Sequence, residues 1–201
     1  MRWVANSNFF FLESKILFTN RKLVLMVIYL KAPICNFCAK TGALCPEDSK
    51  RLKSGQITEL DVESSVKLTK LAEKDKVVDK LTLVKAVESN GDIILLFGSG
   101  NLKLLRANPQ TIDNINKLIG KKVWLFEADA TDRTLLEEAF YPARILTVNI
   151  VWLPDGSKLT KVIIPYSRGI EERIDEKAVK RVLKTLKGLD VMIEYEHRTA
   201  T

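Results

Sequence analysis

The sequence predicts an α+β fold in which one small unit of helices and strands is used twice, after a short cysteine-rich segment. Two observations lead to this prediction. The hairpin-turn glycine Gly91 recurs 65 positions later as Gly156, and the predicted elements around both glycines follow the same order. All three cysteines of the 201-residue chain lie within residues 35–45, ahead of the first unit. We therefore divide the chain into four parts: residues 1–31, 32–56, 57–128 and 129–201.

Residues 1–31 form an amino-terminal extension that we expect to be poorly ordered. Charged residues interrupt its two apolar runs, so neither reaches the roughly 18–20 residues that a bilayer span needs. It has no charged start, continuous apolar core and small-residue cleavage site, which argues against a secretory signal. Residues 1–25 could also lie upstream of a start of translation at Met26. The alternative is a segment that contacts a membrane surface or a partner.

The three cysteines have the spacing of metal ligands. The motif Cys35-x-x-Cys38 is followed by Cys45-x-x-Asp48. Two thiolates separated by two residues fit a knuckle turn whose sulfurs converge on one cation, so we expect Zn²⁺. Asp48 stands where a fourth cysteine would complete the site, and His197 is another candidate fourth ligand. The alternative is a degenerate knuckle with free or buried thiols. Cysteines so clustered do not resemble a secreted disulfide framework, so we expect a cytoplasmic protein.

The first unit follows the order helix, strand, strand, helix, strand. The predicted ranges are, in turn, 57–74, 81–87, 93–97, 111–119 and 123–126. Thr58 can cap the first helix, and Asp61 occupies the capping-box position three residues later. The dipeptide Asn90-Gly91 between two β-prone runs predicts a hairpin. Gly120 ends the second helix.

The second unit repeats this order. The predicted ranges are, in turn, 132–140, 144–152, 159–164, 176–186 and 191–193. Gly120 recurs as Gly188, 68 positions later, and Val123 recurs as Val191 at the same offset. We expect helices to cover one face of each three-stranded sheet and to leave the other face free. Trp124 and Phe126 alternate along one strand, and we expect them to face the core.

The net charge and the lack of catalytic motifs favour an anionic partner over catalysis. Lysine and arginine number 32 against 25 acidic residues, a net charge of +7, which falls to +4 without residues 1–25. The single histidine disfavours Ser-His-Asp chemistry. The sequence contains no phosphate-binding loop motif and no nucleophile motif. We therefore expect neither an enzyme nor a small-molecule substrate.

Several short segments carry a resemblance to a known family. They are Gly120-Lys121-Lys122-Val123, Glu127, Asp129, Glu137-Glu138-Ala139-Phe140, Pro142-Ala143-Arg144, Val148-Asn149-Ile150, and the cysteine segment from Ile34 to Val62. Over about residues 32–196, the chain resembles archaeal NusA-like proteins, which carry two K-homology (KH) domains. The resemblance implies two tandem type II modules (α-β-β-α-α-β) behind a metal-binding leader. It also implies single-stranded RNA binding in transcription elongation or termination.

The sequence departs from the KH pattern at the Gly-x-x-Gly loop, where glycines let the nucleic-acid backbone approach helix amides. The first loop falls on residues 106–109 and the second within residues 173–177, and neither contains glycine. Pro109 also lacks an amide donor. We therefore expect side chains to hold the RNA: Lys103, Arg106, Asn108, Lys117, Arg168, Arg173, Lys177, Lys180, Arg181 and Lys184. Their cations could instead form an ordinary solvated helix face. The alternative function is a scaffold on RNA polymerase or the ribosome that has lost RNA affinity.

Overall fold

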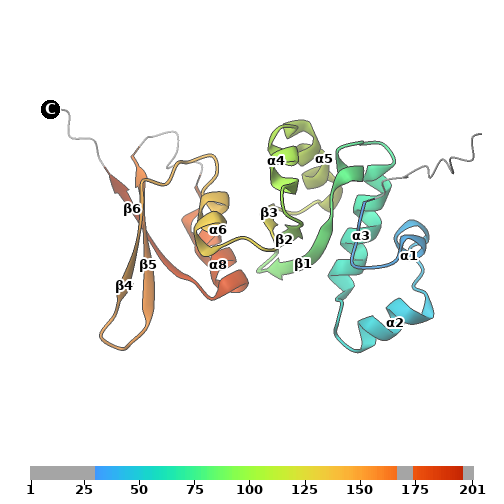
Figure 1. Cartoon of the computed structure of the whole chain (residues 1–201), viewed down its shortest axis with the longest axis horizontal. Coiled ribbons are helices and arrows are strands. Elements are labelled where there is room, and N and C mark those ends of the chain that lie inside the picture. The colour runs from blue at the N-terminus through green and yellow to red at the C-terminus, as the bar shows by residue number, and fades with distance from the viewer. Residues whose placement is uncertain (1–29, 167–173, 197–201) are drawn as a thin grey trace, which may run out of the picture.

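The computed structural model describes residues 30–166 and 174–196. It is an α+β structure with two separate three-stranded sheets arranged along one long axis (Figure 1). The cysteine-rich segment lies at one end, and helices α6 and α8 lie between the two sheets. Residues 1–25, Arg168, Arg173 and His197, about which we made predictions above, lie outside the described residues. Among the described helices, none is both long enough and apolar enough to cross a bilayer.

The cysteine-rich segment consists of two short helices that pack on a longer one. These are α1 (Asn36–Thr41), α2 (Pro46–Lys53) and α3 (Glu59–Ala72). Ile34, Cys38 and Ile57 are buried in a small core that also contacts the side of α3. The predicted capping box of α3 is confirmed, because the Asp61 amide donates to the Thr58 hydroxyl and the Asp61 carboxylate accepts the Thr58 amide.

The first unit runs from α3 to β3. After α3 and the short turn η1 (Val78–Lys80), its elements are β1 (Leu83–Ser89), β2 (Asp92–Phe97), α4 (Asn101–Arg106), α5 (Pro109–Ile119) and β3 (Val123–Glu127). Strands β1 and β2 are antiparallel, and β2 and β3 are parallel. The predicted hairpin is confirmed: Asn90 and Gly91 have φ of 53° and 93°, as a type I′ turn requires. The helical periodicity of the sequence did not predict α4, a six-residue helix in which Leu102 and Leu105 are buried, whereas the α-β-β-α-α-β order implied by the family resemblance has a helix at this place.

The second unit runs from α6 to β6. Its elements are α6 (Asp132–Ala139), β4 (Thr147–Trp152), β5 (Lys158–Pro165), α8 (Glu176–Lys187) and β6 (Asp190–Glu196). Strands β4 and β5 are antiparallel, and β5 and β6 are parallel, as in the first unit. Strand β4 begins at Thr147, three residues after the predicted start at Arg144.

The first sheet is buried on both faces. Ile93, Leu95 and Phe97 belong to the core that contains its own helices. Because side chains alternate along a strand, Ile94 points to the opposite face. There Ile94 and Phe126 join residues of α6, α8 and the second sheet in one continuous core. The prediction that the second face of each sheet is free is therefore wrong for the first sheet, whereas the prediction that Phe126 faces the core is confirmed.

Candidate functional site

Four candidate metal ligands converge at the start of helices α1 and α2. One ligand atom from each of Cys35, Cys38, Cys45 and Asp48 lies within 4.8 Å of the others. Cys35 caps α1, and its sulfur accepts the Cys38 amide at 3.5 Å. Cys45 caps α2 in the same way, and its sulfur accepts the Asp48 amide at 3.4 Å. Each Cys-x-x-ligand motif therefore folds into the same turn, and the two turns face each other.

Asp48 occupies the fourth position as a fixed, buried carboxylate. Its exposed fraction is 2%. One oxygen accepts the Cys35 amide at 2.9 Å, and the other accepts an N–H of Arg51 at 3.0 Å. Arg51 is itself held, because it also donates to the Pro33 carbonyl at 2.8 Å. Burial opposes ionisation of Asp48, but the hydrogen bonds from the Cys35 amide and its other neighbours hold its pKa below the usual value.

The thiols differ in their electrostatic surroundings. Burial raises the pKa of Cys38 to about 12, although the Cys45 amide donates to its sulfur at 3.1 Å. The Asp48 amide lowers the pKa of Cys45. The Cys35 and Cys38 sulfurs are 3.3 Å apart. Tetrahedral zinc with sulfur ligands at about 2.3 Å needs sulfurs roughly 3.8 Å apart, so these two sulfurs would have to separate slightly around the ion. The clustering of all four ligand atoms within 4.8 Å is compatible with a metal site.

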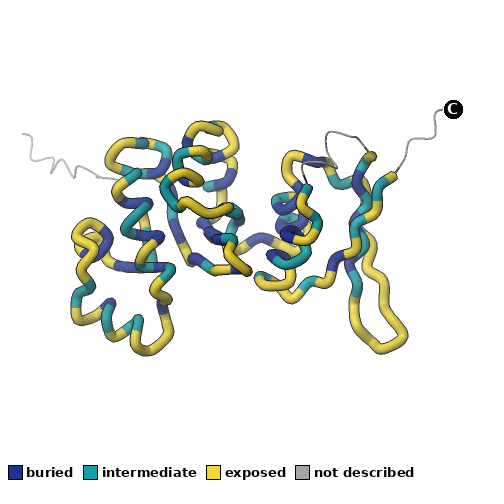
Figure 2. Tube along the Cα trace, turned by 180° about the vertical axis from the view of Figure 1, so that it is seen from behind, coloured by how far each residue is buried: buried dark blue, intermediate teal, exposed yellow. Residues whose placement is uncertain are grey.

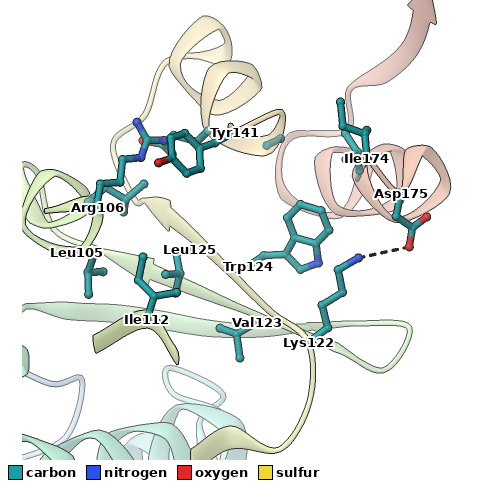
Figure 3. A pocket seen from close by; sticks show the side chains of 14 residues that line it. Leu105, Arg106, Ile112, Lys122, Val123, Trp124, Leu125, Tyr141, Ile174 and Asp175 are labelled. Carbon is teal, nitrogen blue, oxygen red and sulfur yellow. Dashed lines mark hydrogen bonds and ion pairs between the residues drawn. The ribbon is translucent and has the colours of Figure 1, made fainter. Parts of the chain in front are cut away.

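A second candidate site lies where the two units meet. A pocket of about 320 Å³ is lined by residues of α4, α5, β3, α6 and α8 (Figure 3). Both predicted RNA-binding loops border this pocket, since Arg106 belongs to the first loop and Asp175 to the second. The glycine-free loops therefore lie on one shared pocket.

The pocket between the units combines aromatic rings with balanced charge. The Arg106 guanidinium lies 4.6 Å from the centre of the Tyr141 ring. Lys122 lies 4.8 Å from the Trp124 ring and 3.3 Å from the Asp175 carboxylate (Figure 3). Burial raises the pKa of Glu138 to about 7, and the nearby Glu127 carboxylate adds to the rise. The pocket is therefore lined by two cations, Arg106 and Lys122, and two acidic residues, Glu138 and Asp175.

The other predicted RNA-binding residues of the first unit do not gather in this pocket. Lys103 is exposed on α4. Asn108 stands at the start of α5, but its side-chain amide donates to the Leu104 carbonyl at 2.9 Å. Lys117 lines a separate hollow on the other side of α5, beside Lys74.

The predicted cations of the second unit that the structure describes all lie on α8, and three of them have acidic neighbours. The pairs are Lys180 with Glu176 at 3.5 Å, Lys184 with Asp190 at 2.8 Å, and Arg181 with Asp92 at 3.9 Å. These three cations also line a hollow of about 420 Å³ beside the β4–β5 hairpin. Lys177 is exposed one turn closer to the start of α8.

The sequence analysis did not single out the tip of this hairpin. Ile150 and Trp152 are 65% and 64% exposed, and the Lys158 ammonium lies 4.6 Å from the centre of the Trp152 ring. The signal was present in the sequence. An apolar run from Ile150 to Leu153 ends directly at a turn, where a half-buried strand would alternate with polar residues.

Comparison with known proteins adds little to this description. No protein-family model matches the chain, and no curated protein matches it. One solved structure, "Crystal structure of APE1850", is similar at 18% sequence identity over 57% of this chain and 88% of that chain. Its TM-score of 0.39 is too low to carry an argument about fold or function.

Proposed function

We propose that the chain is a non-enzymatic protein that binds single-stranded RNA through two KH-like modules of type II. The observation that carries this proposal is the shared topology of the two units. Each has a helix, an antiparallel strand pair, a helical connection, and a last strand parallel to the second. In the first unit the connection is the helix pair α4 and α5, which fits the α-β-β-α-α-β order implied by the resemblance to archaeal NusA-like proteins; in the second unit the described part of the connection is α8. By the same resemblance, the protein acts in transcription elongation or termination.

In this proposal, side chains replace the missing loop glycines as phosphate ligands. Lys103 and Arg106 flank the first loop, and Lys180 and Lys184 project from α8. The ion pairs of Lys180 and Lys184 are partly exposed, and such pairs contribute only about 0–1 kcal/mol, so phosphates can displace the carboxylates. Two linked modules raise the effective concentration of the second contact after the first has formed.

We also propose that Cys35, Cys38, Cys45 and Asp48 hold a structural zinc ion. The support is the paired turns, which present three sulfurs and one carboxylate oxygen within a few ångströms. When bound, zinc supplies a cross-link between the starts of α1 and α2. Without the ion, the small apolar core around Cys38 packs these two helices against α3.

Salt dependence tests RNA binding. A fluorescein-labelled twelve-nucleotide oligo-U RNA should bind the full chain at low salt, and log K should fall linearly with log salt concentration. The triple variant Arg106→Ala, Lys180→Glu, Lys184→Glu should bind at least about 10-fold more weakly without a change in melting temperature. A control with the same change in charge, Lys85→Ala, Lys53→Glu, Lys70→Glu, should retain more affinity. Equal losses would mean that we have chosen the wrong surface.

One observation favours the alternative function, a protein-binding scaffold on RNA polymerase or the ribosome. The acidic residues Glu127 and Asp129 lie close enough to Glu138 to raise its pKa, and Glu138 also lies near Arg106 of the first loop, where RNA phosphates would have to pass. Complete lack of RNA binding at low salt would contradict our first proposal and support this one.

Metal content tests the zinc proposal. The native mass of the wild-type protein should include about one zinc ion, and Cys38→Ser should lose it. Proteolysis of that variant should remove the segment around α1 and α2, while the body from residue 57 onward stays folded. Absence of metal from the wild type, or unchanged metal content in the variant, would contradict the proposal.

A further inference from the structure

The β4–β5 hairpin extends an inward-facing strand surface beyond the helices that cover it. Val148 pairs with Val162 on the face that joins the core of the second unit. By alternation, Ile150 and Trp152 lie on that same face, nearer the turn. Both are nevertheless about two-thirds exposed, at 65% and 64%. The tip of the hairpin projects past α6 and α8 and is exposed on both strands (Figures 1 and 2).

The exposed tryptophan adjoins a basic hollow. The Lys158 ammonium lies 4.6 Å from the centre of the Trp152 ring. The same Lys158 lines the hollow of about 420 Å³ together with Lys180, Arg181 and Lys184 of α8. One lysine therefore connects an exposed aromatic ring to three further cations.

The hollow carries an excess of positive charge. Its lining includes four cations and one carboxylate, that of Asp190. Lys184 pairs with Asp190, and Lys180 pairs with Glu176 on its own helix. Both lysine side chains are more than one-third exposed in these pairs, at 66% and 43%. Exposed pairs are weak, so these lysines can exchange a carboxylate for a phosphate.

An exposed ring beside a row of cations has the chemistry of a single-strand binding surface. Bases stack on aromatic side chains with little sequence preference, while lysines and arginines follow the phosphates. The pocket between the units has fewer cations, because among the described residues only Arg106 and Lys122 line it and Lys122 pairs with Asp175. The loops beside that pocket also lack the glycines that would admit an RNA backbone.

We propose that single-stranded RNA binds along the β4–β5 hairpin and α8, with one base stacked on Trp152 and neighbouring phosphates against Lys158, Lys180 and Lys184. The proposal rests on the proposed RNA-binding function, and it moves the main contact away from the glycine-free loops. Strand β4 is also an edge strand, to which a strand of a partner protein could add. We favour RNA because strand addition uses backbone groups and gives no role to the four cations.

Tryptophan fluorescence tests the stacking contact. In the full chain, Trp3→Phe with Trp124→Phe leaves Trp152 as the sole tryptophan. Oligo-U and oligo-A of twelve nucleotides, titrated at low salt, should quench its emission as they bind. In the wild-type background, Trp152→Ala should weaken binding of both RNAs by about 10-fold, and Trp152→Phe should recover most of the loss because it keeps a ring. Melting temperatures of the variants check that each is folded.

The outcomes separate this inference from the proposed function. Binding without quenching, with the same affinity in Trp152→Ala, would overturn the hairpin contact and leave RNA binding intact. No binding of either RNA by the wild type would overturn both. A shift of Trp152 emission with protein concentration alone, together with unchanged RNA affinity in Trp152→Ala, would show that the edge strand pairs with a second copy and would also overturn the proposal.

Discussion

The two units share a topology but differ at equivalent positions of their last strands. At an offset of 68 residues, Trp124 of β3 corresponds to Met192 of β6, and Phe126 corresponds to Glu194. Phe126 is fully buried under the helices of the second unit, and Trp124 packs against the same core. Met192 is 41% exposed, and Glu194 forms an ion pair with Lys161.

The difference shows how two similar units become one body. Helices α6 and α8 are covered on both sides, by the first sheet and by the second (Figure 1). The first sheet is therefore a middle layer with two apolar faces, and the second is an outer layer with a polar outer face. The two hairpins differ accordingly: Ser89, beside the turn of the first, is buried and bonds Thr185 of α8 at 3.0 Å, whereas Ile150 and Trp152 of the second are exposed.

The largest expected effect tests the shared layer. Phe126→Ala removes a fully buried ring from the core that joins the units, so it should lower the free energy of unfolding by about 3–5 kcal/mol. The equivalent change in the second unit, Glu194→Ala, breaks one partly exposed ion pair and should cost less than about 1 kcal/mol. Urea unfolding of both variants measures the two costs. Equal costs would contradict the assignment of β3 to a middle layer.

A smaller effect tests how each unit attaches its first helix. Asp61 of α3 accepts the buried Ala86 amide of β1 at 2.6 Å, in addition to forming the capping box. In α6, the equivalent Thr134 bonds the hydroxyl of Thr131 instead. Asp61→Ala leaves the Ala86 amide unpaired and should cost about 2 kcal/mol, whereas Thr134→Ala should cost under about 0.5 kcal/mol. Melting temperatures of the two variants measure these losses, and equal melting temperatures would contradict the predicted difference.

Local signals predicted the repeated elements well. The Asn90-Gly91 turn and the Thr58 capping box act over a few residues, so their structures follow from their sequence. Periodicity did not predict α4, because six residues are too few to show a helical period. The burial of the second face of the first sheet was missed although the sequence contains its signature: β3 is apolar on both faces, which is typical of a strand buried on both sides.

The candidate sites were predictable to different degrees. The spacing of the cysteines correctly predicted that the four candidate ligands lie together, because each Cys-x-x-ligand turn forms within four residues. The hydrogen bond from Arg51 to the Pro33 carbonyl depends on how α2 lies against Pro33, which spacing does not determine. The contact between Trp152 and Lys158 depends on strand register across the hairpin, and the junction pocket depends on packing between the units. Neither follows from motifs.

The smallest expected effect tests whether the junction between the units is shielded from water. Burial raises the pKa of Glu138, which lines the junction pocket, from 4.5 to about 7. The folded protein therefore binds this proton more tightly than the unfolded chain, so the contribution to stability is full below pH 4.5 and is lost as the pH rises through 7. Glu138→Gln stays neutral at every pH and should gain about 1 kcal/mol over the wild type between pH 4 and pH 8, after allowance for solvent screening. Glu137→Gln, on the exposed side of α6 where Glu137 pairs with Arg133, is the matched control and should not show this gain. Urea unfolding at the two pH values measures both gains, and equal gains would mean that water reaches the junction and that the two units are joined less tightly than the shared core indicates.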